Sequence, residues 1–257
     1  MNDALIGYTG FVGSNLARQH EFAGLYRSSN IASIRGKEFD TLVFSAAQAK
    51  KWWANLHPAE DWAGIQAALS PLATVRARQV VLISTIDVLP NGMSADESTD
   101  CKSDAHHDYG KHRLRLEQEL SGQFESVTIV RLPALFGEGL KKNVIFDLLT
   151  DNQLEKIQPE SSFQYYDLER LWSDIERVRS SGTRLIHLFP EPVSTESILA
   201  RFFPGKVVGG DALPAQHYDY RTRYSALFGR SDGYIFGREE VLERLGRFIA
   251  ARAGAAR

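Results

Sequence analysis

Three glycines near the start of the chain separate a short apolar run from a helical pattern. They lie in Gly7-Tyr8-Thr9-Gly10-Phe11-Val12-Gly13, which follows Ala4-Leu5-Ile6 and precedes a predicted helix over 11–22. In such a turn one glycine permits the tight bend, one lets the backbone approach a pyrophosphate, and one allows close helix–strand packing. The first helical turn then offers free N–H groups and a positive dipole end to the phosphates. The segment therefore predicts a phosphate-binding turn at the end of a buried strand.

The rest of the chain alternates apolar runs with helical patterns. Predicted strands lie at 25–26, 41–44, 79–83, 127–130 and 185–188, and predicted helices at 59–78 (reshaped near Pro71), 109–120, 144–149, 168–178, 195–203 and 239–251. Continuous β-branched runs separated by helices are typical of parallel strands covered on both faces. Right-handed crossovers then give a doubly wound, Rossmann-type α/β fold. The 257 residues predict a single dinucleotide-binding unit, with smaller substrate-binding parts near 134–170 and 188–235 interleaved with its core.

Composition limits the partners that the chain can have. A net charge of −2 gives no global field that favours nucleic acid or an anionic membrane. No apolar run approaches the roughly 18 residues needed to span a bilayer, and no basic segment indicates a signal peptide. Cys101 is the one cysteine, so no intrachain disulfide forms, and its polar surroundings predict a surface thiol. We expect a cytoplasmic protein with a small-molecule substrate and neither nucleic-acid nor membrane partners.

Four later segments continue the pattern that the glycine turn begins. They are Asp40-Thr-Leu-Val-Phe-Ser-Ala-Ala47, Ile83-Ser-Thr-Ile-Asp-Val88, Tyr109-Gly-Lys-His-Arg113 and Arg131-Leu-Pro-Ala-Leu-Phe-Gly137. With the spacing G-x-x-G-x-x-G, the chain resembles the extended short-chain dehydrogenase/reductase family of sugar-nucleotide epimerases, dehydratases and reductases. The resemblance covers most of the chain and is strongest over the first 140 residues. It is specific for fold and family and unspecific for the substrate.

The second predicted strand favours NADP(H) as the cofactor. Folds that prefer NAD usually have an acidic residue about 20 residues past the turn, whereas this chain has Tyr26-Arg27-Ser28-Ser29-Asn30. Arg27, helped by Ser28, suits a 2′-phosphate that a carboxylate would repel, and NAD(H) remains the alternative. The resemblance implies cofactor contacts from Gly7, Thr9, Gly10, Phe11, Val12, Gly13, Ser45, Ala46, Ala47, Tyr109, Arg113, Leu132 and Pro133.

The resemblance also implies a tyrosine that exchanges a proton with the substrate oxygen while nicotinamide exchanges a hydride with the carbon. Tyr109 stands at that position, and Thr85 is the residue that orients the oxygen, with Ser84 as second choice. The family has a lysine four residues after the tyrosine, on the same helix face, where this chain has Arg113. Arg113 keeps a positive charge that favours tyrosinate and donates to ribose hydroxyls. Asp61 stands in the segment that usually carries an asparagine.

Three residues are predicted to contact the substrate. Asn143 begins a predicted helix where related enzymes often bind the substrate's diphosphate. Lys50 and Trp52 follow the third strand, on the loop side where ligands bind in open sheets. Two adjacent histidines do not make a metal site, and no metal is assigned. Because family members often pair helices, the resemblance implies a homodimer with the Tyr109 helix as the candidate face.

Three functions remain open from the sequence. The first is an NADP(H)-dependent reductase of a keto-sugar, which the resemblance implies is linked to a nucleotide. The second is an epimerase or dehydratase with tightly held NAD, which would use the same tyrosine. The third is a catalytically weak dinucleotide-binding regulator, which the departures at Arg113 and Asp61 keep open.

Overall fold

The computed structural model describes residues 1–89, 94–101, 107–211 and 213–255. The chain forms two compact units. The first comprises Met1–Asn91, Glu97–Leu132 and Glu169–His187, and the second comprises Gly92–Asp96, Pro133–Leu168 and Leu188–Arg257. Each unit is therefore assembled from three separate stretches of sequence.

A six-stranded parallel sheet forms the centre of the first unit, in the order β2-β1-β3-β4-β5-β9. Its strands are β1 (Asp3–Ile6), β2 (Gly24–Tyr26), β3 (Glu38–Phe44), β4 (Arg76–Thr85), β5 (Val127–Leu132) and β9 (Leu185–His187). β2 and β3 lie on the two sides of β1, so the strand order reverses there. In doubly wound sheets, ligands bind outside the carboxyl ends of the strands at such a reversal.

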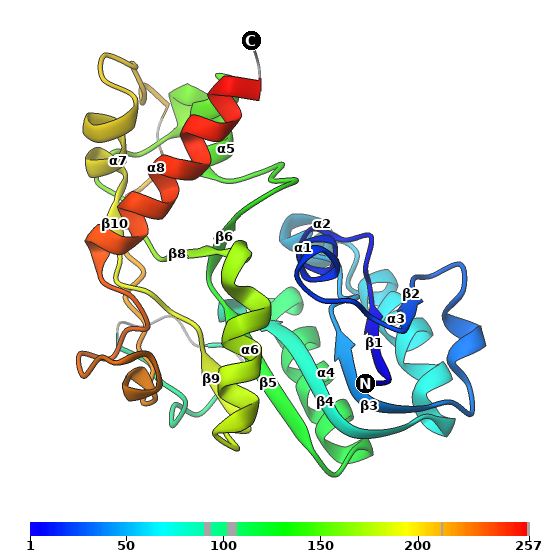
Figure 1. The fold of residues 1–257 in the computed structure, drawn as a ribbon. Helices are drawn as coiled ribbons and strands as arrows, with labels where there is room; N and C mark the ends of the chain where they lie inside the picture. Colours follow the sequence, from blue (N-terminus) through cyan, green and yellow to red (C-terminus); the bar gives the residue numbers. More distant parts are fainter. Residues whose placement is uncertain (90–93, 102–106, 212, 256–257) are drawn as a thin grey trace. The chain divides into compact units, whose positions relative to one another are not determined.

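Helices cover both faces of this sheet (Figure 1). α1 (Phe11–Gln19) contacts α6 (Leu171–Ser180), and on the other face α3 (Pro58–Leu69) contacts α4 (Asp108–Gln123). The short helix α2 (Lys51–Leu56) contacts both α3 and α4. Single 3-10 turns lie at η1 (Ile31–Ile34), η2 (Ser70–Thr74), η3 (Ile86–Val88), η4 (Leu154–Lys156), η5 (Leu168–Arg170) and η6 (Ser225–Phe228). The observed sheet and its helical layers confirm the predicted doubly wound α/β fold.

A buried set of charges fixes α4 to the sheet. Arg131 on β5 donates from Nε and Nη2 to the two carboxylate oxygens of Glu117 on α4, at 3.0 and 2.7 Å. The Ser84 hydroxyl on β4 donates to the same carboxylate, and Arg131 also meets Nε2 of His187 at 3.2 Å. Because each charged group is paired and hydrogen-bonded, the set can be buried at moderate cost.

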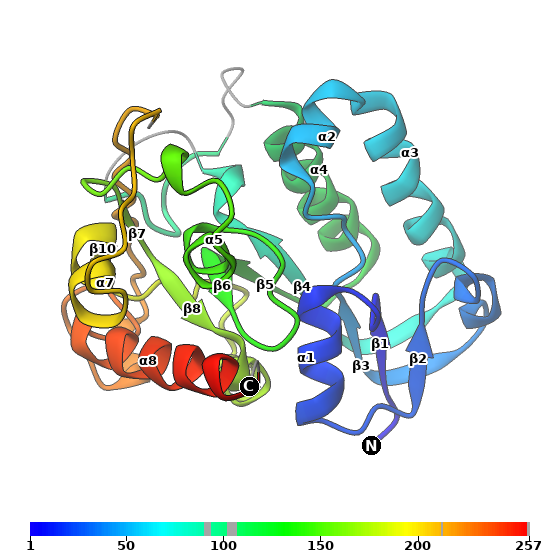
Figure 2. The ribbon, with the colours of Figure 1, turned by 90° about the horizontal axis from the view of Figure 1, so that it is seen from above.

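The second unit contains two small sheets. β6 (Ala134–Phe136) pairs in parallel with β8 (Tyr165–Asp167), and β7 (Ser162–Phe163) pairs antiparallel with β10 (Val193–Ser194). α8 (Arg238–Ala255) packs against β8, β10 and α7 (Thr195–Phe202), as Figure 2 shows, and α5 (Val144–Thr150) begins after Asn143. Buried Gln164 joins the parts of this unit, since its amide donates to Pro190 O and Tyr220 O and accepts from Tyr220 N.

Most predicted elements occur close to their expected bounds. The predicted helix over 59–78 is shorter, because α3 ends at Leu69, a 3-10 turn follows, and β4 already begins at Arg76. α1 ends at Gln19 rather than Phe22, and α8 continues to Ala255. Cys101 is buried, so the predicted surface thiol is wrong. Its neighbouring segment folds against the sheet, where Glu97 accepts from the backbone N–H of His187 at 2.8 Å. Burial raises the pKa of the Cys101 thiol above its ordinary value.

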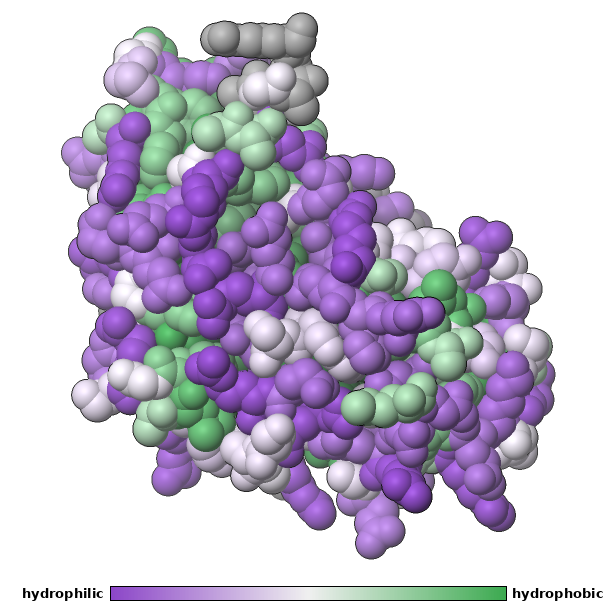
Figure 3. All heavy atoms as spheres, viewed as in Figure 1, coloured by the Kyte–Doolittle hydropathy of each residue, from purple (hydrophilic) through white to green (hydrophobic). Residues whose placement is uncertain are grey.

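The face seen in Figure 3 carries mainly hydrophilic side chains, with separate smaller apolar areas. Among the described residues, no helix has both the length and the apolar character required to cross a bilayer.

Candidate active site

The carboxyl ends of five neighbouring strands bring most of the predicted site residues to one edge of the sheet. Ile6 is paired with Tyr26 on β2 and with Phe44 on β3, and Thr85 on β4 is paired with Leu132 on β5. The residues at this edge, in the order of the strands, are Arg27, Gly7, Ser45, Thr85 and Leu132.

The three glycines of the turn between β1 and α1 differ in what a side chain at each position would meet. Gly7 has φ +89°, and a Cβ there would lie 2.6 Å from the carbonyl oxygen of Ser45. A Cβ on Gly13 would lie 2.1 Å from the carbonyl oxygen of Gly7, which is backbone and cannot rotate away. Gly10 differs, because a Cβ there would meet only Gly7 O, at 3.3 Å. Gly7 and Gly13 thus serve close packing, whereas a side chain at Gly10 would meet one backbone neighbour, the Gly7 carbonyl oxygen.

The segment after β3 supports this turn from the neighbouring strand. Ser45 donates to Ile6 O from both its backbone N–H and its hydroxyl, each at 2.9 Å. Ala46 and Ala47 are partly buried and pack against the hydrophobic core. Ser45 therefore joins the ends of β1 and β3.

Arg27 follows β2 directly and is exposed, as are Ser28 and Ser29. Its backbone N–H donates to Oδ1 of Asn30 at 2.7 Å, and its Nε donates to Oγ of Ser29 at 2.9 Å. The Asn30 amide in turn donates to Leu25 O at 3.0 Å. A compact turn thus holds the Arg27 guanidinium beside two hydroxyl-bearing residues.

Tyr109 lies in the first turn of α4 and is 6% exposed. Its backbone N–H donates to Oδ1 of Asn55 at 3.0 Å. Burial raises the pKa of the Tyr109 phenol above its ordinary value, and the Asp87 carboxylate acts in the same direction. The Arg113 charge and hydrogen bonding with Arg113 and Thr85 act against this shift without cancelling it. Tyr109 is therefore neutral near pH 7.

Asp87 links several polar groups beside Tyr109. One of its carboxylate oxygens accepts from Nζ of Lys51 on α2 at 2.6 Å and lies 3.5 Å from Nε2 of His107. The other accepts from the Thr85 hydroxyl at 3.2 Å. His107 caps α4, since its Nδ1 accepts from Gly110 N at 3.0 Å. Lys51 thus has a carboxylate partner within the site.

Arg113 forms a buried ion pair with Asp61 of α3. Its Nη1 lies 3.0 Å from Oδ2 and its Nη2 lies 3.2 Å from Oδ1, and the two residues are 3% and 6% exposed. Nη2 also donates to the carbonyl oxygen of Gln48. The guanidinium carbon lies 4.3 Å from the centre of the Tyr109 ring. Arg113 and Asp61, the two residues that depart from the family pattern, therefore form an ion pair with each other.

Two features of this edge fit a nicotinamide dinucleotide. Gly10 carries no side chain next to the first turn of α1, where main-chain N–H groups lack intrahelical acceptors. The Nε of Arg113 is buried and has no hydrogen-bond partner among the described residues. A ribose hydroxyl is an acceptor that would satisfy it.

The residues predicted to contact substrate lie in different surroundings. Lys50 and Trp52 are exposed at the start of α2, and Trp52 is 66% exposed. Leu132 ends β5 in the first unit, whereas Pro133 begins a stretch of the second. Asn143, also in the second unit, has φ +118°, accepts from Phe146 N and donates to Leu135 O at 2.9 Å. Its side chain thus has local partners as the cap of α5.

Sequence reasoning missed Asp87 and Lys51 as partners. Asp87 stands two residues after Thr85, within a segment that carries the family resemblance, so its position was a usable signal. Lys51 is 36 residues from Asp87, and no local pattern indicates their pairing. Ser84 donates into the buried Glu117 carboxylate, which leaves Thr85 as the hydroxyl beside Tyr109.

No model of a known protein family matches the chain, and no curated protein does either. Solved structures match over nearly their whole length. A dTDP-4-dehydrorhamnose reductase of Bacillus anthracis, in complex with NADP, is 16% identical, with 97% of each chain covered and a TM-score of 0.73. A UDP-N-acetylglucosamine 4-epimerase of Methanobrevibacter ruminantium is 13% identical, with 99% of this chain and 98% of that chain covered and a TM-score of 0.77. MoeE5, in complex with UDP-glucuronic acid and NAD, is 13% identical, with 99% and 100% covered and a TM-score of 0.75.

The chain has the fold of these reductases and epimerases. The likeness confirms the Rossmann-type architecture that the glycine turn and the alternating pattern predict. At 13–16% identity it is a likeness of fold, so the roles of individual residues rest on their own geometry.

Proposed function

We propose that the protein is an NADP(H)-dependent reductase of the extended short-chain dehydrogenase/reductase type, acting on a keto-sugar carried by a nucleotide. The observation that carries the proposal is Tyr109, which is buried and neutral beside Thr85 at the carboxyl edge of the sheet. A neutral phenol in that position suits a proton donor to a carbonyl oxygen. The fold neighbours, which include an NADP-bound dTDP-4-dehydrorhamnose reductase, support the substrate class.

The proposed reaction divides the work between cofactor and chain. When bound, NADPH supplies a hydride to the carbonyl carbon. Tyr109 donates its phenolic proton to the carbonyl oxygen, which becomes the hydroxyl of the product alcohol, and the resulting tyrosinate recovers a proton from water. Thr85 would orient the carbonyl oxygen by turning its hydroxyl proton from the Asp87 carboxylate to that oxygen, while the backbone N–H of Asp87 keeps donating to the hydroxyl oxygen. Arg113 offers its free Nε to a ribose hydroxyl of the cofactor.

The preference for NADP(H) is assigned to Arg27. Its guanidinium is exposed beside Ser28 and Ser29 immediately after β2, and the turn Arg27–Asn30 contains no carboxylate. A 2′-phosphate could accept two hydrogen bonds from this guanidinium, and no carboxylate of the turn would repel it. Main-chain N–H groups between Thr9 and Gly13 would receive the pyrophosphate, except that of Gly10, which donates to Gly7 O at 2.9 Å.

An epimerase or dehydratase with tightly held NAD is the second candidate, which the likeness to a 4-epimerase and to an NAD-bound structure supports. The two functions differ in cofactor balance, because a reductase consumes NADPH whereas an epimerase shows no net change. Mass spectrometry of the ligand released by denaturing the purified protein distinguishes them. We expect NADP(H) that exchanges freely with added cofactor, and tightly retained NAD would favour the epimerase.

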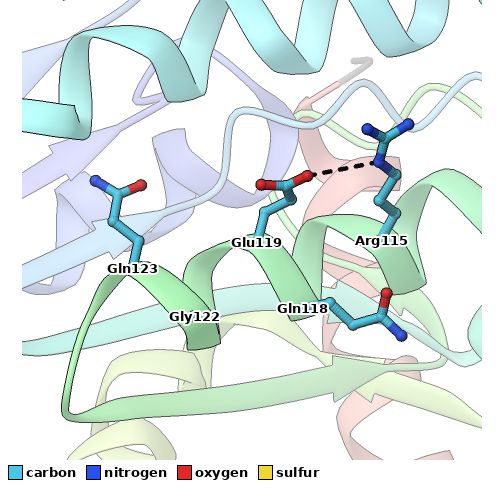
Figure 4. Close-up of a pocket in the computed structure, with 5 residues that line it drawn as sticks. All are labelled: Arg115, Gln118, Glu119, Gly122 and Gln123. Carbon is cyan, nitrogen blue, oxygen red and sulfur yellow. Dashed lines mark ion pairs between the residues drawn. The ribbon is translucent and has the colours of Figure 1, made fainter.

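We also propose a cytoplasmic homodimer formed by the outer faces of α3 and α4. The exposed side of α3 carries the small residues Ala63, Gly64 and Ala67, which permit close approach. Beside it, α4 has a shallow polar hollow with an ion pair between Arg115 and Glu119 at 3.5 Å, and Figure 4 shows these side chains along the helix. Light scattering of wild type and Ala67→Arg tests this, with a dimer expected for the first and a monomer for the second.

A further inference from the structure

The charged groups around Tyr109 form two complete ion pairs. Arg113, on the same helix, is paired with Asp61 on α3, and Lys51 on α2 is paired with Asp87 on η3. Each positive charge near the phenol therefore has a carboxylate within hydrogen-bond distance. Among the described residues, no cation without a carboxylate partner faces the Tyr109 ring.

The other titratable groups around this turn are two histidines, which add no charge when neutral, and one further ion pair. His107 precedes α4 and faces Asp87, at 3.5 Å. His112, on α4, meets Oδ2 of Asp61 at 2.9 Å. On β5, Arg131 is paired with Glu117, one turn beyond Arg113 along α4.

The family pattern has a lysine at position 113 and an asparagine near position 61, which leaves a net positive charge beside the tyrosine. Here the positive charge is kept and a carboxylate is added. The guanidinium carbon is 4.3 Å from the Tyr109 ring centre, close enough for a free cation to stabilise tyrosinate strongly. The bidentate contact with Asp61 offsets part of this charge, because the field of an ion pair falls off faster than that of a single charge. Arg113 still acts to lower the Tyr109 pKa, and burial outweighs it.

We propose that Asp61 is a positioning residue that holds Arg113 in an ion pair and offsets part of its charge at Tyr109, so that the buried Tyr109 works as a neutral acid and the site is adapted to reduction. Reduction needs the phenol, which is the abundant form at neutral pH. Oxidation of the alcohol needs the tyrosinate, which this charge arrangement makes scarce. The overall equilibrium of the reaction is unchanged. The role of Tyr109 as a proton donor rests on the proposed function. The pairing of the charges around it rests on the described contacts.

The test is the ionisation of Tyr109 in the cofactor-free protein. Carbon-13 labelling of tyrosine Cζ lets each phenol be titrated by nuclear magnetic resonance, and Tyr109→Phe identifies the signal. In wild type we expect Tyr109 to ionise with a pKa above the ordinary value of a tyrosine, because it is buried. Asp61→Asn should lower its pKa by about 1 to 3 units, which is typical of an uncompensated charge 4–6 Å away. Asp61→Glu keeps the carboxylate and should retain the wild-type value.

Two double variants keep the test decisive if Asp61→Asn fails to fold, since a buried guanidinium without its carboxylate is destabilising. Asp61→Asn with Arg113→Lys restores the family pattern and should also lower the Tyr109 pKa. Asp61→Asn with Arg113→Gln removes both charges and should not lower the Tyr109 pKa. A wild-type Tyr109 that ionises below pH 10, or a Tyr109 pKa unaffected in the lysine variant, would overturn the inference.

Calorimetric titration with NADPH separates this inference from the proposed function. If wild type binds no NADPH, the proposed function fails whatever the Tyr109 pKa is. If it binds NADPH and the charge variants leave Tyr109 unmoved, the inference fails and the proposed function stands.

Discussion

Gly110 allows the first turn of α4, which carries Tyr109, to lie against the backbone of η3. A Cβ on Gly110 would lie 2.4 Å from the carbonyl oxygen of Asp87, a backbone atom that no side-chain rotation can move. Overpacking of this kind typically costs about 1–3 kcal/mol, and a backbone contact belongs at the upper end. The better helix propensity of alanine returns up to about 1 kcal/mol. We therefore expect Gly110→Ala to lower the free energy of unfolding by about 2 kcal/mol.

Gly122 in the last turn of the same helix is the matched control. It is exposed, and a Cβ there would meet no atom within 4 Å. Gly122→Ala should gain up to about 1 kcal/mol from helix propensity alone, so the two variants should differ by about 3 kcal/mol. Urea denaturation of wild type and both variants measures the difference. Equal stability of Gly110→Ala and Gly122→Ala would refute the close approach of α4 to η3.

Three further expectations follow from charges in the first unit and from buried phenols. Glu117→Gln should cost about 3 kcal/mol, because Arg131 keeps a buried charge without its counter-ion, whereas Glu119→Gln on the exposed side should cost less than about 0.5 kcal/mol in the same urea assay. Arg27→Glu should reverse the preference for NADPH over NADH in calorimetric titration, and an unchanged ratio would remove Arg27 from the 2′-phosphate site. Burial raises the pKa values of Tyr109 and Tyr165 in the folded state. Since the unfolded phenols ionise near pH 10, their stabilisation is complete below that pH and is lost as the pH rises further. Urea midpoints from pH 8 to 11 should fall at the alkaline end, less steeply for Tyr165→Phe, and an equal fall in both proteins would contradict this.

The fold could be predicted from the sequence because its strongest signals are local. The glycine turn after Ile6 and the apolar runs of β3, β4 and β5 specify strands, and the intervening helices make them parallel. The strands β6, β7, β8 and β10 are two or three residues long, too short for a period to be read. Their pairing depends on contacts with distant segments, which local patterns do not encode.

The sequence predicts which residues lie at the candidate site, but it does not predict how their charged side chains are paired. Tyr109 and Thr85 stand in recognisable segments at helix and strand ends. The pairing of Arg113 with Asp61 joins residues 52 positions apart, and both had been noted as separate departures from the family pattern. Only the packing of α3 against α4 brings them together and converts two departures into one ion pair. The prediction that Cys101 is a surface thiol is wrong for a related reason, because its polar neighbours in sequence are not its neighbours in space.

The proposed function is tested most directly by single-turnover reduction of nucleotide-linked keto-sugars with NADPH, comparing wild type with Tyr109→Phe. The substitution removes only the phenolic oxygen, so ring packing and NADPH affinity should be retained. General acid catalysis typically contributes about 10² to 10⁴ in rate, so the chemical step should slow by that factor. A wild type that binds NADPH and reduces none of these substrates, or a Tyr109→Phe variant that reduces one as fast as wild type, would contradict the proposal.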